Sequence, residues 1–169
     1  MGRNVEAPGG RAGTHQFTAI IPHDPSKFPS GYLSDIGDGR QGFIIGAHNV
    51  NRTLQVIVNQ RGDLAAAREN FSGNVVGQSW NPESFYVEFP RGVGVDTYGQ
   101  QFLDAARNFA LNTRPDPIDY PRFFGIGENS NTWNVSIHLF LGGNAPNDLR
   151  GLEPGNDDRF SDSLFQGPQ

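Results

Sequence analysis

One apolar helix, predicted over residues 130–141, constrains the fold of this chain most. Apolar side chains recur there at positions i, i+4, i+7 and i+8, which is the repeat of an α-helix with one buried face: Trp133, Ile137, Phe140 and Leu141. Two glycines follow directly, and glycine favours the left-handed backbone at helix C-termini. A helix this apolar has to pack against another apolar surface, which we expect the strands upstream to supply.

The predicted start of this helix is polar. Ser130 lies there between Asn129 and Asn131. The first N–H groups of a helix lack partners within it, and the helix dipole is positive at this end, so the position favours negative charge on a nucleophile or on an acyl oxygen. All three residue types are also common N-caps. Taken alone, the stretch favours a cap without chemistry.

Upstream, the sequence predicts several short strands and two more helices. β-branched and aromatic residues, in part alternating, indicate the strands, and alanine-rich or amphipathic repeats indicate the helices. Asp63 is interpreted as the N-cap of the first helix. The 22 Gly and 12 Pro predict long loops, so we expect an α+β domain with an antiparallel sheet packed against two main helices. The predicted strands are 15–21, 42–48, 53–58 and 83–89, and the predicted helices are 64–70 and 96–112.

The ends of the chain carry no periodic pattern. Residues 1–13 are rich in Gly, Pro and Arg and are predicted to form a flexible arm. The domain itself is expected over residues 14–143, followed by an irregular segment over 144–169. Residues 164–168, Leu-Phe-Gln-Gly-Pro, resemble a viral 3C-type protease site of the kind left by expression vectors, so we exclude them from fold reasoning.

Composition removes several classes of function. The net charge is −5 and the thirteen cations are scattered, which argues against nucleic acid. No cysteine is present, so disulfides, thiolate metal sites and a cysteine nucleophile are excluded. The four histidines are far apart in sequence, and we expect no metal and no cofactor. No apolar run has the length of a membrane span or a signal peptide, which predicts a soluble protein, cytoplasmic or exported by a leaderless route.

The order of elements resembles that of circularly permuted papain-like domains. Lecithin retinol acyltransferase-like proteins and PPPDE-type peptidases carry an Asn-Cys-x-His-Phe or Asn-Cys-Asn-His-Phe signature at the nucleophile helix. Residues 129–133, Asn-Ser-Asn-Thr-Trp, are similar to it, with Ser for Cys, Thr for His and Trp for Phe. His15, at the start of the first predicted strand, resembles the strand histidine of these families. The resemblance spans residues 14–143 in element order but only a few residues in detail.

This resemblance implies a hydrolase or acyltransferase acting on an amide or ester bond of a peptide, protein or lipid-like acyl substrate. Ser130 would be the nucleophile and His15 the general base, because a serine hydroxyl must lose its proton during attack. The family's orienting group stands on the following strand, which suggests His48. Backbone N–H groups with the Asn129 or Asn131 amide would form the oxyanion hole.

Two other functions fit the same residues. One is a catalytically inactive papain-like domain that binds a partner in the same groove, with Ser130 as a cap. The other is a bacterial effector or toxin domain delivered to another cell. Ser130 is either the natural residue or an engineered replacement of a catalytic cysteine, made to hold the protein inactive.

Overall fold

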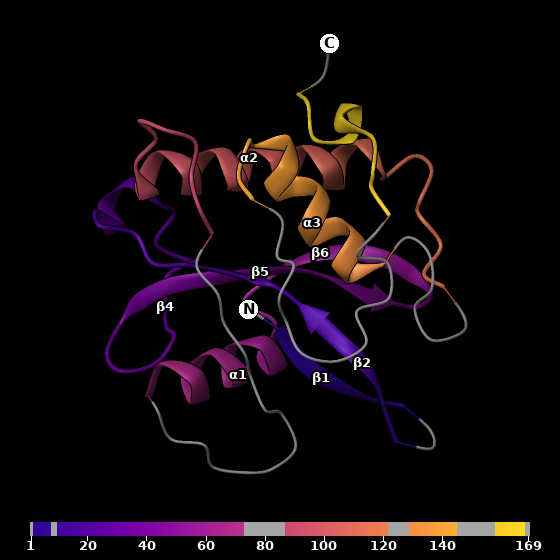
Figure 1. Cartoon of the computed structure of the whole chain (residues 1–169), viewed down its shortest axis with the longest axis horizontal. Helices are drawn as coiled ribbons and strands as arrows, with labels where there is room; N and C mark the ends of the chain where they lie inside the picture. Colours follow the sequence, from indigo (N-terminus) through magenta and orange to yellow (C-terminus); the bar gives the residue numbers. More distant parts are fainter. Residues whose placement is uncertain (1, 8–9, 73–86, 122–128, 145–157, 168–169) are drawn as a thin grey trace.

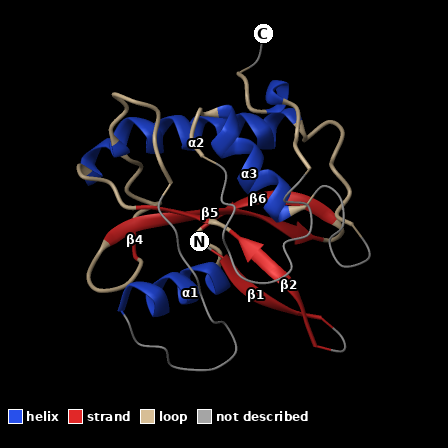
Figure 2. Ribbon diagram, viewed as in Figure 1, coloured by secondary structure: helices blue, strands red, loops and turns tan. Residues whose placement is uncertain are grey.

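The computed structural model describes residues 2–7, 10–72, 87–121, 129–144 and 158–167. These residues form an α+β fold in which antiparallel strands pack against helices (Figures 1 and 2). The predicted α+β class with an antiparallel sheet is therefore confirmed. No helix in these ranges is long and apolar enough to cross a membrane.

The long strand β5 (Gln41–Val50) organises the main sheet. It pairs with β3 (Thr18–Ile20), β4 (Ser34–Asp35) and β6 (Thr53–Val58), always antiparallel. The β5–β6 hairpin predicted from sequence is present, and its two turn residues, at positions 51 and 52, have positive φ angles of 51° and 69°. Such a pair is the geometry that two-residue hairpin turns require.

Helices cover the two faces of this sheet. Figure 1 shows α2 (Val95–Asn112) and α3 (Ser130–Phe140) on one side and α1 (Arg61–Ser72) on the other. Each side has its own apolar core. The predicted helix over 96–112 is confirmed within one residue, and the helix predicted over 64–70 extends further at both ends.

Alternation along β5 divides the strand between these cores. Phe43, Ile45 and Ala47 belong to the core beneath α2 and α3, whereas Ile44 belongs to the core beneath α1 together with Phe17. Successive side chains of a strand point to opposite faces, so a residue's parity in β3 and β5 decides which helices it meets.

The predicted apolar face of α3 is present in part. Trp133 and Ile137 are fully buried, and the rings of Phe102 and Phe109 in α2 meet the indole edge-on at 5.9 and 6.3 Å. The last two members of the predicted stripe, at positions 140 and 141, are only partly buried, because the helix ends there.

Two described segments near the ends of the chain differ from the sequence prediction. The arm expected over residues 1–13 instead contributes to a hairpin of β1 (Gly2–Ala7) and β2 (Gly10–Gln16). Its pairing runs through backbone groups, which leave no periodic side-chain pattern to recognise. Near the other end, the protease-like stretch takes part in the fold, because Phe165 is buried and stacks on Phe109 and Phe140 at 5.2 and 5.5 Å.

The fourth predicted strand has no counterpart in the described chain. Residues 83–86 lie outside the described ranges, and residues 87–89 are not in a strand.

Candidate functional site

The N-terminus of α3 is capped by Asn129. Its side-chain oxygen accepts from the backbone N–H groups of Asn131 at 2.7 Å and Thr132 at 3.2 Å. The Thr132 hydroxyl accepts in return from the Asn129 N–H at 3.2 Å, which completes a capping box. Ser130, the first helical residue, is only 3% exposed and is not the cap. The capping alternative raised for Ser130 therefore belongs to Asn129.

Hydrogen bonds tie this end of α3 to the strand segment that carries His15. The backbone N–H of Gln16 donates to Asn131 Oδ1 at 2.9 Å, and Asn134 Nδ2 donates to Gln16 Oε1 at 3.3 Å. The immediate sequence neighbours of His15 and Ser130 are thus in direct contact, although 115 positions separate Gln16 from Asn131.

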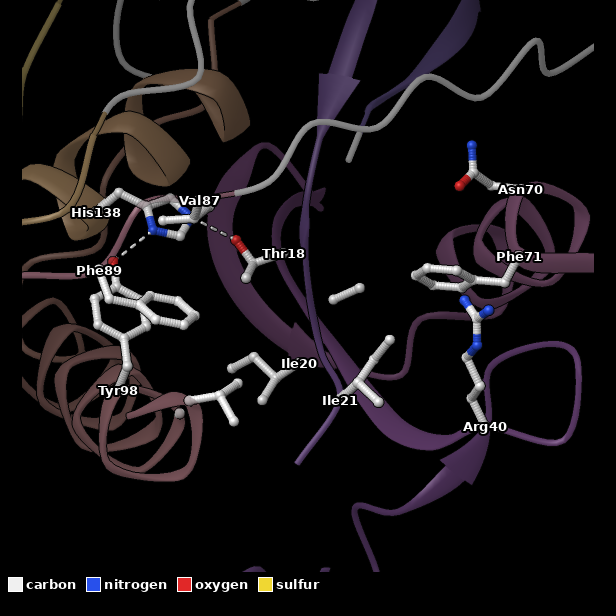
Figure 3. A pocket seen from close by; sticks show the side chains of 13 residues that line it. Thr18, Ile20, Ile21, Arg40, Asn70, Phe71, Val87, Phe89, Tyr98 and His138 are labelled. Carbon is white, nitrogen blue, oxygen red and sulfur yellow. Dashed lines mark hydrogen bonds between the residues drawn. The ribbon is translucent and has the colours of Figure 1, made fainter. Parts of the chain in front are cut away.

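Farther along α3, a directional chain of hydrogen bonds runs through His138. The Thr18 hydroxyl donates its single hydrogen to Asn134 Oδ1 at 2.8 Å, so His138 Nε2–H has to donate to Thr18 Oγ1, also at 2.8 Å. His138 Nδ1 is then the acceptor for the Tyr98 hydroxyl at 2.8 Å. Figure 3 shows the Thr18, His138 and Tyr98 part of this chain. It joins α2, α3 and β3.

Burial keeps the His138 and Tyr98 side chains of this hydrogen-bond network uncharged. Desolvation lowers the pKa of His138 to about 3, because the charged imidazolium would have to leave water. Desolvation raises the pKa of Tyr98 for the corresponding reason, since its phenolate would be buried. At neutral pH the network therefore holds α3 in place through neutral hydrogen bonds alone.

A pocket of about 480 Å³ opens beside this chain. Figure 3 shows Thr18 and His138 at one side and Phe71 with Arg40 at the other, the guanidinium standing 5.0 Å from the Phe71 ring centre. The wall between them is mainly apolar: Ile20, Ile21, Val87, Phe89 and Val95. His138 lies eight residues beyond Ser130, so this pocket begins about 12 Å along the helix from it.

On the α1 face, two histidines meet one carboxylate. His15 near the end of β2 and His48 in β5 face each other, and their ring centroids are 4.6 Å apart. Asp63, fully buried on α1, places Oδ2 3.3 Å from His15 Nε2 and 3.1 Å from His48 Nε2.

Electrostatics hold Asp63 as a carboxylate. Burial alone would raise its pKa, but the contacts with His15 and His48 outweigh burial and keep the pKa well below its ordinary value. Asp63 was interpreted from sequence as a helix cap, and that interpretation is wrong. The Gln60 side-chain oxygen accepts from the Gly62 and Asp63 N–H groups instead, which leaves the carboxylate for the histidines.

The structure thus places the predicted site residues in two groups. His15 and His48 lie together, joined by Asp63, which sequence reasoning missed as a site residue. Asn129, Ser130 and Asn131 lie together at the start of α3. Among the hydrogen bonds of the described residues, none joins the Ser130 hydroxyl to the His15 ring.

Comparison of the chain with protein-family models, curated proteins and solved structures finds no match. The papain-like resemblance therefore depends on the residues that suggested it, and it stays a prediction. The coarse architecture and the geometry of the two residue groups are the basis for any functional argument.

Proposed function

We propose that this protein is a hydrolase or acyltransferase that cleaves an amide or ester bond, with Ser130 as nucleophile and His15 as general base. The observation that carries the proposal is the hydrogen bond from Gln16 N–H to Asn131 Oδ1, because it sets the two segments side by side at a helix N-terminus. In the permuted papain-like arrangement, these are the segments that supply base and nucleophile.

Asp63 takes the orienting role in this proposal. It accepts from His15 Nε2, so the nitrogen that would receive the Ser130 proton is Nδ1, on the other edge of the ring. A carboxylate in that position fixes the tautomer and stabilises the imidazolium formed during attack. His48, which the sequence suggested for this role, contacts the same carboxylate and would support it indirectly.

The reaction needs a change from the described arrangement. General-base catalysis requires the ring nitrogen and the hydroxyl within about 2.6–3.2 Å, and geometry often tightens only when substrate binds. The proposal therefore includes a side-chain rotation that brings His15 to Ser130. Asn129 and Asn131 use their side-chain oxygens in the cap and the Gln16 contact, so their Nδ2 groups are the ones with the polarity to donate to an oxyanion.

The pocket beside His138 suits the apolar part of an acyl substrate. Its wall is mostly aliphatic and aromatic, and it touches the helix that begins at Ser130 through His138. A peptide, protein or lipid-like substrate with an apolar acyl group would place that group there and its carbonyl near the start of α3.

A second candidate is an inactive papain-like binding domain. It is favoured by the separation just described, since the Ser130 hydroxyl and the His15 ring do not form a hydrogen bond with each other in the described structure. In that case the pocket binds a ligand without turnover.

Covalent labelling separates the two without knowledge of the substrate. The purified chain is treated with a fluorophosphonate probe and analysed by intact-mass and peptide mass spectrometry. An active nucleophile gives one adduct on Ser130, lost in Ser130→Ala and reduced at least about 100-fold in rate in His15→Ala. Ser26→Ala is the matched control: its exposed hydroxyl bonds to Asp24, and the variant should label like the unmodified chain.

A thiol replacement adds a readout of the base itself. In Ser130→Cys, a nearby imidazole lowers the thiol pKa, so iodoacetamide should react faster near neutral pH than with an unperturbed cysteine. Identical rate profiles for Ser130→Cys with His15 and with His15→Ala, together with no Ser130 adduct in the unmodified chain, would reject the enzyme in favour of the binding domain.

A further inference from the structure

The cluster of His15, His48 and Asp63 has the spacing of a metal site. One ligand atom from each residue lies within 4.8 Å of the others, and the two nitrogen-to-oxygen separations are 3.1 and 3.3 Å. Ligands about 2.0–2.1 Å from a tetrahedral Zn²⁺ are about 3.3 Å from one another. The two measured edges therefore match the edges of a zinc coordination tetrahedron.

The direction of the His48 ring supports a cation between these atoms. His48 Nε2 is buried, and no acceptor among the described residues is in hydrogen-bond geometry to it. Asp63 Oδ2 is 3.1 Å away, but off the direction in which a ring N–H would point. A ring nitrogen and a carboxylate oxygen that approach without such a bond are both satisfied when their lone pairs point at one positive ion.

The backbone leaves room for this convergence. Gly46 faces the cluster, and a Cβ there would lie 3.1 Å from His48 Nε2 and 3.2 Å from Asp63 Oδ2. Any other residue at this position would crowd the atoms that converge. The glycine thus permits one side chain each from β2, β5 and α1 to meet.

We propose that His15 Nε2, His48 Nε2 and Asp63 Oδ2 bind one divalent transition-metal ion of the Zn²⁺ type. Two imidazoles and a carboxylate are a ligand set that suits such ions, and three protein ligands leave a fourth position for water or another small ligand. The Asp63 carboxylate would supply negative charge to the ion, and its Oδ2 is within 3.3 Å of both ring nitrogens. The sequence predicted no metal because these histidines are 33 positions apart, whereas the fold brings their rings within 4.6 Å of each other.

Metal binding stands on this geometry alone, whereas its consequence for catalysis rests on the proposed function. An imidazole whose Nε2 holds a metal ion has lost the Asp63 hydrogen bond that orients it as a base. The metal-bound form should therefore be inactive, and the ion would regulate the enzyme by competing for His15.

The test uses the untagged full chain, treated with EDTA and then titrated with Zn²⁺ in competition with a chromophoric chelator. We expect one equivalent to bind. His48→Gln and Asp63→Asn should each weaken binding on the order of 100-fold or more, because each removes a ligand. His23→Gln, which changes an exposed histidine outside the cluster, should bind as the unmodified chain does.

Two further measurements keep the result decisive if a variant folds poorly. Co²⁺ bound to the unmodified chain should show the intense visible absorption of a four-coordinate site. Zn²⁺ should raise the Tm of the unmodified chain and of His23→Gln, but not of His48→Gln. Failure to bind an equivalent, or equal affinities in the unmodified chain and His48→Gln, would overturn the site and leave Asp63 only as the polar partner of the two histidines.

The two proposals fail separately. Ser130→Ala should bind Zn²⁺ normally, because Ser130 is not a ligand. If the metal-free chain is labelled at Ser130, added Zn²⁺ should slow labelling at least about tenfold and EDTA should restore it. Absence of labelling with intact metal binding rejects the enzyme and leaves the metal site. Labelling without metal binding does the reverse.

Discussion

The two faces of the sheet hold histidines in opposite settings. On the face beneath α2 and α3, His138 is fully buried, and each of its ring nitrogens has its own neutral partner. On the face beneath α1, His15 and His48 converge on one oxygen of one ionised carboxylate. The first arrangement is complete without charge, whereas the second concentrates negative charge between two bases.

This difference shows that burial alone does not mark a functional histidine. His138 is the most buried of the three, and its hydrogen bonds fix the position of α3 against β3. The cluster around Asp63 uses a charged group where apolar packing would serve stability as well or better. Its chemistry is therefore the better explanation for its presence on that face.

The largest expected effect comes from removing one histidine side chain on each face of the sheet and comparing the losses of stability. His138→Ala removes a buried ring together with its hydrogen bonds to the Tyr98 and Thr18 hydroxyls, so we expect a loss of about 3–5 kcal/mol in the free energy of unfolding. His48→Ala should cost less than about 2 kcal/mol, because its buried Nε2 has no hydrogen-bond partner in the described structure. Urea denaturation in the presence of EDTA measures both. Equal losses would mean that the two clusters are both structural.

The second prediction uses pH to isolate His138. In the unfolded chain its pKa is near 6.5, whereas in the folded chain burial lowers the pKa to about 3. Between these values the unfolded state binds the extra proton, so the contribution of His138 to stability is complete above pH 6.5 and decreases as pH falls. At 1.36 kcal/mol per pH unit, acidification from 6.5 to 4.5 should cost roughly 2–3 kcal/mol.

The measurement is the free energy of unfolding against pH for the unmodified chain and for His138→Gln. His15 and His48 are present in both, so their titration cancels in the difference. The carboxylates, including Asp63, are also present in both chains, so their partial protonation near pH 4.5 cancels in the same difference. Parallel curves would show that His138 is not held neutral by the fold.

The sequence predicted the parts of this fold that have long periodic patterns. Helix α2 and the β5–β6 hairpin fall within one or two residues of prediction, because amphipathic repeats and turn residues are local signals. The sequence did not predict the β1–β2 pairing, because that pairing depends on backbone hydrogen bonds. It did not predict the burial of Phe165 either, because the segment around Phe165 resembles a vector remnant.

The sequence predicted single residues of the site from local patterns, but not how these residues come together. Ser130 at a helix start and His15 on a strand follow from local spacing, but Asp63 has the local signature of a helix cap. Its role depends on how α1 docks against the strands that carry the two histidines, which is a long-range feature. The meeting of His15 in β2 with His48 in β5 is long-range as well, so no local pattern encodes it.

The smallest expected effect concerns Ser130, the first residue of α3. Asn129 accepts two backbone hydrogen bonds as the cap of α3, so Asn129→Ala should cost about 1 kcal/mol in the free energy of unfolding. Ser130→Ala should change it by less than about 0.5 kcal/mol, because no hydrogen bond of its hydroxyl is found among the described residues and alanine fits the same space. Urea denaturation of both variants measures the contrast.

The same pair of variants decides what a buried hydroxyl is doing at this helix start. A serine that contributes nothing to stability, yet is required for fluorophosphonate labelling, is retained for chemistry, because a capping residue already occupies the preceding position. If Ser130→Ala instead loses about as much stability as Asn129→Ala and the unmodified chain takes up no probe, Ser130 is part of the structural network centred on His138. The chemistry of the molecule would then be confined to the face that carries Asp63.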